Sequence, residues 1–113
     1  MRLPNPDHAQ IGSSKLRDYL LSSAHPIGRF IRSFFNSLGY YSEEWELLKA
    51  DLLDLAATGE ARLGQTTDYG QKYEIRGILT GPSGKTAEIV SVWIILTGDD
   101  IPRFITVFPG VKR

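Results

Sequence analysis

The side chains that could perform acid–base chemistry around an anion are spread along the whole sequence. Imidazole is the best general acid or base near neutral pH, and lysine or arginine can stabilise a developing negative charge. Hydroxyl groups can hold an anionic group by hydrogen bonds. The residues that we expect in catalysis are His25, Tyr73, Arg76 and Arg103, and those expected in substrate binding include Lys15 and Thr106.

Four of these residues also have a purely structural interpretation. His25 precedes Pro26, where a histidine often packs or caps a turn, and Lys15 fits a solvated helix surface. The two arginines lie in apolar strand segments, so each could instead pair with a glutamate across a sheet, either Glu74 or Glu88. Both interpretations stay open at the level of sequence.

No group of residues has the composition of a metal or nucleotide site. His8 has only Asp7 beside it, and the adjacent pair Asp99-Asp100 would need several more oxygen ligands to hold calcium. The segment 81–85 contains glycine and lysine, yet it joins two strand-like segments, so a hairpin turn explains it better than a phosphate loop. We therefore expect no metal and no cofactor.

Length and composition describe a single globular domain of balanced charge. The chain has 113 residues, with 13 basic and 13 acidic side chains, so any binding site for a polyanion must be a local patch. The absence of cysteine suits a reducing compartment, and we expect a cytoplasmic location, although the tip of a larger secreted toxin would have the same composition. The longest apolar run, 89–96, is too short to span a membrane.

The elements that must position these side chains follow from local patterns. Proline and glycine punctuate 1–12, which we expect to form an extended arm. Apolar residues at helical spacing predict three helices, over 13–22, 26–38 and 42–58. Residues 60–72 are polar and rich in glycine, and we expect a loop there. β-Branched residues predict strands over 73–80, 86–97 and 103–108, of which the second is apolar on both faces and should be central.

Together these elements predict an α+β fold, with three N-terminal helices packed on one face of a three- to four-stranded antiparallel sheet. Residues 1–113 form one domain in this prediction, made of an arm (1–12), a helical part (13–59), a loop (60–72) and the sheet (73–109). The opposite face of the sheet is left free. A functional site is expected on that face.

Four stretches together resemble an uncharacterised bacterial family, the DUF6883 domain, over nearly the whole chain. These stretches are Lys15 to Leu21, His25 to Gly28, Phe34-Phe35 with Leu38 to Tyr40, and Tyr69-Gly70 with Thr80 to Pro82, Trp93 and Pro102-Arg103. Members of the family resemble either short standalone proteins or the C-terminal tips of polymorphic toxins. Their layout is similar to that of metal-independent RNase toxins of the barnase, colicin and RelE type.

The resemblance implies roles for the residues named above. This chain also departs from the family pattern at one position. An RNase of this kind needs a base for the 2′-hydroxyl, cations for the phosphorane and an acid for the leaving oxygen. The family pattern has a lysine where this chain has Ile31-Arg32, and Arg29 or Arg32 could take the place of that lysine. Arg29 is therefore added to the residues expected to bind substrate.

Two functions follow as expectations. The first is a toxin-like, metal-independent endoribonuclease whose partners are RNA and a small cognate antitoxin or immunity protein. The second is a catalytically silent binding module, or a degenerate toxin, that pairs with a small cognate protein. The sequence sets neither the RNA target nor the oligomeric state.

Overall fold

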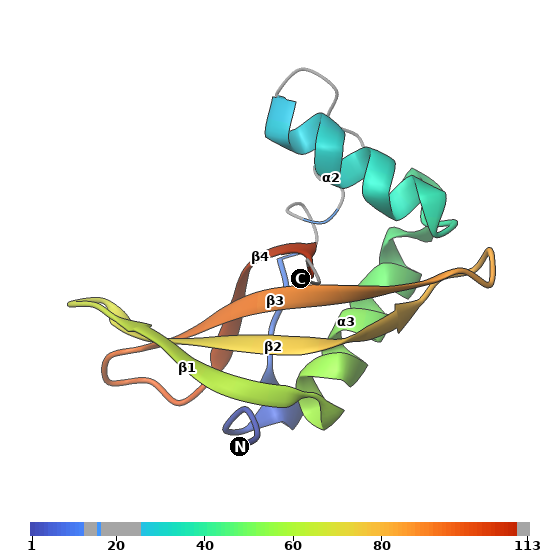
Figure 1. Ribbon diagram of the computed structural model, residues 1–113. Coiled ribbons are helices and arrows are strands. Elements are labelled where there is room, and N and C mark those ends of the chain that lie inside the picture. Colours follow the sequence, from blue (N-terminus) through green and yellow to red (C-terminus); the bar gives the residue numbers. More distant parts are fainter. Residues whose placement is uncertain (13–15, 17–25, 111–113) are drawn as a thin grey trace.

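The structure is a computed structural model that describes residues 1–12, 16 and 26–110, with only the backbone of 26–30. Two α-helices precede a four-stranded sheet in the described residues, and two short 3-10 helices accompany them (Figure 1). The elements are η1 (Pro6–His8), α2 (Pro26–Ser37), η2 (Ser42–Glu44), α3 (Trp45–Thr58), β1 (Glu60–Thr66), β2 (Gly70–Thr80), β3 (Thr86–Leu96) and β4 (Pro102–Pro109).

The sheet is an antiparallel meander with the strand order β1-β2-β3-β4. The predicted hairpin turn at 81–85 is confirmed, since β2 ends at Thr80 and β3 begins at Thr86. β3 lies between β2 and β4, as its two apolar faces predicted. The sheet begins earlier in the chain than expected, because Glu60–Thr66 is a strand paired with β2.

The prediction of a loop over 60–72 is therefore wrong. Strand β1 occupies its first half, β2 begins at Gly70, and only 67–69 remain as a turn. Ala61 is the one buried residue of β1, and the alternation of charged and apolar residues in this edge strand is confined to 60–63. Its backbone hydrogen bonds to β2 stabilise it instead, and such bonds leave no mark in the sequence.

The helical part differs from the prediction in the number of helices. The described residues contain two α-helices, α2 and α3, where three were expected. The first expected helix, over 13–22, lies outside the described residues except for Leu16, which is helical and fully buried. Gly39 follows α2 with a positive φ of 100°, a conformation that favours glycine and ends a helix.

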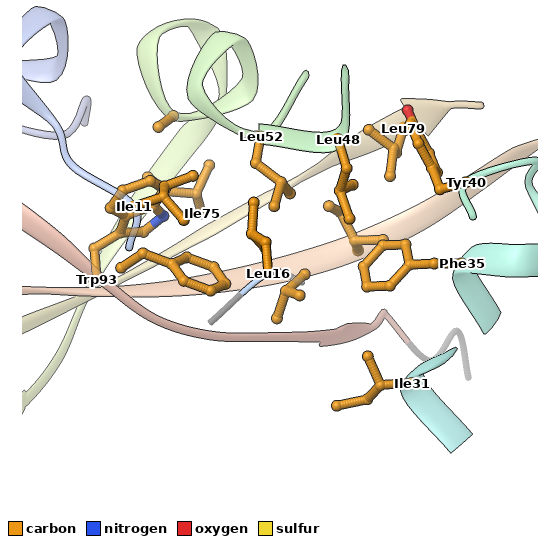
Figure 2. Close-up of a cluster of buried hydrophobic side chains, with 14 of the residues drawn as sticks. Ile11, Leu16, Ile31, Phe35, Tyr40, Leu48, Leu52, Ile75, Leu79 and Trp93 are labelled. Carbon is orange, nitrogen blue, oxygen red and sulfur yellow. The ribbon is translucent and has the colours of Figure 1, made fainter. Parts of the chain in front are cut away.

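One hydrophobic core joins the helices to a single face of the sheet. Leu48, Leu52 and Ala56 of α3 are fully buried, and their four-residue spacing forms the stripe that faces the strands. Alternate residues of the sheet, such as Ile75 and Trp93, meet this stripe (Figure 2). Figure 1 accordingly shows α3 behind the sheet, with the other side of β1, β2 and β3 facing the viewer.

The N-terminal residues reach both edges of the sheet. The backbone nitrogen of Ala61, on β1, donates to the carbonyl oxygen of Met1 at 2.9 Å. Gln10 forms an isolated parallel bridge with Arg103, on β4 at the opposite edge. The same N-terminal segment adds to the core through two buried side chains, Leu3 and Ile11.

Candidate functional site

The sheet face opposite the helices carries a hollow lined mainly by charged side chains. Side chains alternate between the two faces of a strand, so the residues that alternate with the core positions gather on this side. No described helix covers it. The hollow has a volume of about 300 Å³ and is lined by Glu60, Arg62, Glu74, Arg76, Gly77, Glu88 and Val90.

The strand register explains how these charges come together. Glu60 of β1 is opposite Arg76 of β2, and Arg62 is opposite Glu74, so each cross-strand pair joins opposite charges. Val90 of β3 is opposite Arg76 and forms an apolar floor, with only 2% of its surface exposed. Carboxylates outnumber guanidinium groups here, so an anionic ligand would be held by short-range hydrogen bonds rather than by bulk attraction.

Arg76 and Glu88 form the best-defined contact in this hollow. Nη1 of Arg76 donates to Oε1 of Glu88 at 3.0 Å, and the Arg76 side chain remains 53% exposed while that of Glu88 is 20% exposed. The alternative that Arg76 pairs with a glutamate across the sheet is thus confirmed. A guanidinium group held in this way keeps donors available for a ligand, because it has five N–H bonds.

Gly110 lets the backbone pass close to this pair. Its nitrogen donates to the carbonyl oxygen of Glu88 at 2.7 Å. A Cβ atom on Gly110 would lie 2.9 Å from Nη1 of Arg76 and 3.1 Å from Oε1 of Glu88. Any larger residue at this position would push the ion pair aside.

Arg103 lies in a different hollow, at the edge formed by β4 and the N-terminal residues. Its Nη1 donates to Oε1 of Gln10 at 3.1 Å and its Nη2 to Oδ2 of Asp99 at 3.2 Å. The expected pairing with Glu74 or Glu88 is therefore wrong for Arg103. This hollow, of about 640 Å³, is lined by Ala9, Gln10, Ile11, Gly12, Lys49, Leu53, Arg103 and Phe104, and none of these is a carboxylate.

The two arginines that we expected to converge on one phosphate are apart. Arg76 is opposite Val90 and Arg103 is opposite Ile94, four residues further along β3. At about 3.3 Å per residue this offset is roughly 13 Å along the strand, and two further strand spacings separate β2 from β4. A single phosphate group cannot contact both side chains in this arrangement.

Asp99 holds Arg103 and two backbone groups at the turn before β4. Its carboxylate accepts hydrogen bonds from the nitrogen atoms of Asp100 at 2.7 Å and Ile101 at 3.3 Å. The backbone hydrogen bond from Asp100, and then that from Arg103, lower the pKa of Asp99 below its usual 3.8. The adjacent aspartates thus organise a turn, and no group of three or more metal-binding side chains occurs in the described part of the chain.

The remaining predicted residues fall into three groups. Tyr73 is opposite Trp93 and packs against the core, so it lies on the helix side and cannot join Arg76. Thr106 is opposite Val92 on the same face as the charged hollow. His25 and Lys15 lie outside the described residues, as does the side chain of Arg29, whose backbone belongs to α2.

Of the residues that line the charged hollow, only Arg76 is among the candidates predicted from the sequence. Glu60 and Arg62 fall in the segment predicted as a loop, and Glu74 and Glu88 are predicted only as ion-pair partners. The alternation of charged and apolar residues over 60–63 is a signal that could have revealed β1. Ile31, at the departure from the family pattern, is buried in the core and has no place in either hollow.

Comparisons with known proteins place the chain by sequence and by fold. The family model described as "Domain of unknown function (DUF6883)" matches residues 2–111. No curated protein matches the sequence. Among solved structures, a chain of the "Contact-dependent growth inhibition toxin - immunity protein complex from Klebsiella pneumoniae 342" superposes with a TM-score of 0.73.

That superposition covers 95% of this chain and 97% of the other, at 15% sequence identity. The fold is therefore shared over nearly the full length of both chains. No described helix is long and apolar enough to cross a membrane.

Proposed function

Since the chain belongs to the DUF6883 family and has the fold of a chain from a toxin–immunity complex, we propose that it is a toxin-like, metal-independent endoribonuclease. The single observation that carries this proposal is the hollow on the free face of the sheet, where two guanidinium groups and three carboxylates meet. Carboxylates can accept protons, and guanidinium groups can hold a phosphate.

In this proposal Glu88 is the general base. Its carboxylate accepts the proton of the ribose 2′-hydroxyl, and the 2′-oxygen attacks phosphorus. The bond between phosphorus and the 5′-oxygen breaks, which leaves a 2′,3′-cyclic phosphate, and the departing 5′-oxygen takes a proton from an acid. Arg76 and Arg62 stabilise the charge that develops on the phosphorane. His25 remains our candidate for the acid.

The substrate-binding residues form a smaller set than the sequence suggested. Thr106 shares the free face of the sheet and stays in the proposal, as do Lys15 and Arg29. Tyr73 is withdrawn because it lies on the opposite face. Arg103 is withdrawn from catalysis because Gln10 and Asp99 hold it in the other hollow.

The test is cleavage of single-stranded RNA by the purified chain. We expect 2′,3′-cyclic phosphate ends, full activity in a chelator, and no cleavage of an oligonucleotide that lacks the 2′-hydroxyl at the cut site. Glu88→Gln and Arg76→Ala should each lower the rate by a factor of about 10² to 10⁴. Matched controls are Glu46→Gln on α3 and Lys85→Ala in the hairpin turn, both exposed and absent from the lining of the hollow.

Equal activity in the Glu88→Gln and Glu46→Gln variants would refute the assignment of the base. A parent chain that leaves RNA intact would refute the ribonuclease itself.

A second candidate is a binding module that pairs with a small cognate protein, such as an immunity protein. The observation that favours it is the mixed character of the free face, where Ile78 and Phe108 are exposed near the paired Arg76 and Glu88, and Leu96 is exposed at the far end of β3. Co-expression with small neighbouring proteins tests this candidate. Because an active toxin also binds its immunity protein, a stable complex favours the silent module only if neither component cleaves RNA.

A further inference from the structure

Phe108 is an exposed aromatic residue on the same sheet face as the charged hollow. It lies on β4, opposite Val90 of β3, and 42% of its surface is exposed. Val90 is in turn opposite Arg76, and Arg76 is opposite Glu60. A single row across the four strands therefore runs from a carboxylate through a guanidinium and an apolar floor to an aromatic ring.

The spacing within this row suits a nucleotide. Arg76 and Phe108 are two strands apart, which is about 10 Å between their backbones. Val90 between them lines the charged hollow together with Arg76, so a ligand in the hollow lies next to Phe108, the neighbour of Val90 on β4. A phosphate held by Arg76 would thus direct its attached sugar and base across Val90 toward the phenyl ring.

We propose that Phe108 is a stacking platform for a nucleobase of single-stranded RNA, next to the phosphate bound at Arg76. This inference rests on the proposed function and adds to it the side chain that receives a base of the single-stranded substrate. The ring can stack on a base of any identity, because every base has a π-face. Double-stranded RNA would be excluded, since its bases are stacked within the helix and cannot reach a sheet surface.

The test measures RNA binding separately from RNA cleavage. A fluorescent 2′-O-methyl oligonucleotide has the bases and phosphates of RNA but no free 2′-hydroxyl, so it can be bound without being cut. Its dissociation constant is measured by anisotropy with the full chain. We expect Phe108→Ala to weaken binding by roughly 5- to 150-fold, and Phe108→Trp to preserve it.

Two further variants control for folding and for loss of apolar surface. Phe108→Leu keeps an apolar side chain without a π-face, so it should bind more weakly than the parent although its thermal unfolding is similar. Tyr69→Ala removes a 77% exposed aromatic residue from the turn between β1 and β2, and it should bind like the parent. An unlabelled duplex should compete poorly with the labelled strand.

Each result decides the matter. Unchanged affinity in Phe108→Ala, or no affinity in the parent, overturns the platform. If the parent cleaves ordinary RNA while Phe108→Ala binds normally, the platform fails and the ribonuclease stands. If binding depends on Phe108 but RNA is never cleaved, the ribonuclease fails and the platform stands. If Phe108→Ala no longer binds a protein partner but keeps its affinity for RNA, the ring serves protein docking and the inference is overturned.

Discussion

The hydroxyl of Tyr40 donates a hydrogen bond to the carboxylate of Asp51 in the middle of α3, and it lies 3.3 Å from the carbonyl oxygen of Thr80 at the end of β2. Tyr40 is fully buried, and its ring packs edge-to-face on Phe35 of α2 at a centroid distance of 6.2 Å. One side chain therefore connects both helices to the sheet.

We expect Tyr40→Phe to destabilise the fold by about 1–3 kcal/mol at pH 7, because the partly buried Asp51 carboxylate loses its donor. Urea unfolding followed by circular dichroism measures the change. Tyr41→Phe is the matched control, since Tyr41 is 50% exposed and adjacent in sequence. Equal stability of Tyr40→Phe and the parent would show that the hydrogen bond contributes nothing.

The same pair predicts a loss of stability at high pH. Burial, followed by the hydrogen bond and charge of Asp51, raises the pKa of Tyr40 well above its usual 10.0. The folded state then keeps the phenol neutral while the unfolded state ionises, so stability is complete below pH 10 and falls as the pH rises above it. The phenylalanine in Tyr40→Phe cannot ionise. The difference in free energy of unfolding between the parent and Tyr40→Phe should therefore become smaller from pH 9 to pH 11 in the same assay.

The ionised Asp99 carboxylate should stabilise the fold at neutral pH, and this stabilisation should be lost in acid. Its lowered pKa means that the folded state favours the ionised carboxylate, so this contribution is present at neutral pH and is lost as the pH falls below the usual 3.8. Asp99→Asn should therefore lower the melting temperature at pH 7, with a difference that disappears toward pH 2. Asp100→Asn, the exposed neighbour, is the control. A difference that persists at pH 2 would contradict the electrostatic cause.

Gly81 is expected to tolerate no side chain. A Cβ atom there would lie 2.0 Å from the carbonyl oxygen of Leu38, where the backbone after α2 contacts the β2–β3 hairpin. The backbone must shift to remove this overlap, at a cost of about 1–3 kcal/mol. Gly81→Ala should therefore lower the melting temperature by roughly 5–20 °C. A Cβ atom on Gly12 would meet no atom of the described residues within 4 Å, so Gly12→Ala should melt near the parent. Equal melting temperatures for the two variants would disprove the close contact.

Ser91 and Trp93 form a buried polar pair on β3. The Nε1 atom of Trp93 donates to the hydroxyl oxygen of Ser91 at 2.9 Å, and both residues are almost fully buried. Ser91→Ala leaves the indole N–H without this acceptor, at an expected cost of about 1–3 kcal/mol. Urea unfolding monitored by tryptophan fluorescence measures it, with Ser83→Ala in the exposed turn for comparison. A cost no greater than that of Ser83→Ala would argue against the pair.

The parts of the fold that could be predicted are those with a strong local pattern. The helix that begins at Pro26 and ends before Gly39, the turn at 81–85 and the interior position of β3 all follow from nearby residues alone. The candidate site was predicted only in part, since Arg76 was named while its partner Glu88 was one of two options. Strand β1 was missed because pairing with β2, rather than its own apolar residues, stabilises it.

By itself the sequence determined the α+β class, the balanced charge and the inventory of groups that could act on a phosphate, because these depend on composition and short-range periodicity. Only the tertiary structure decided which of these groups meet. The register of the antiparallel strands places Arg76 and Glu88 on one face and Tyr73 on the other, and Asp99 and Gln10 hold Arg103 at a distant edge. Register depends on contacts between segments far apart in the chain, and a shift of one residue would exchange the two faces.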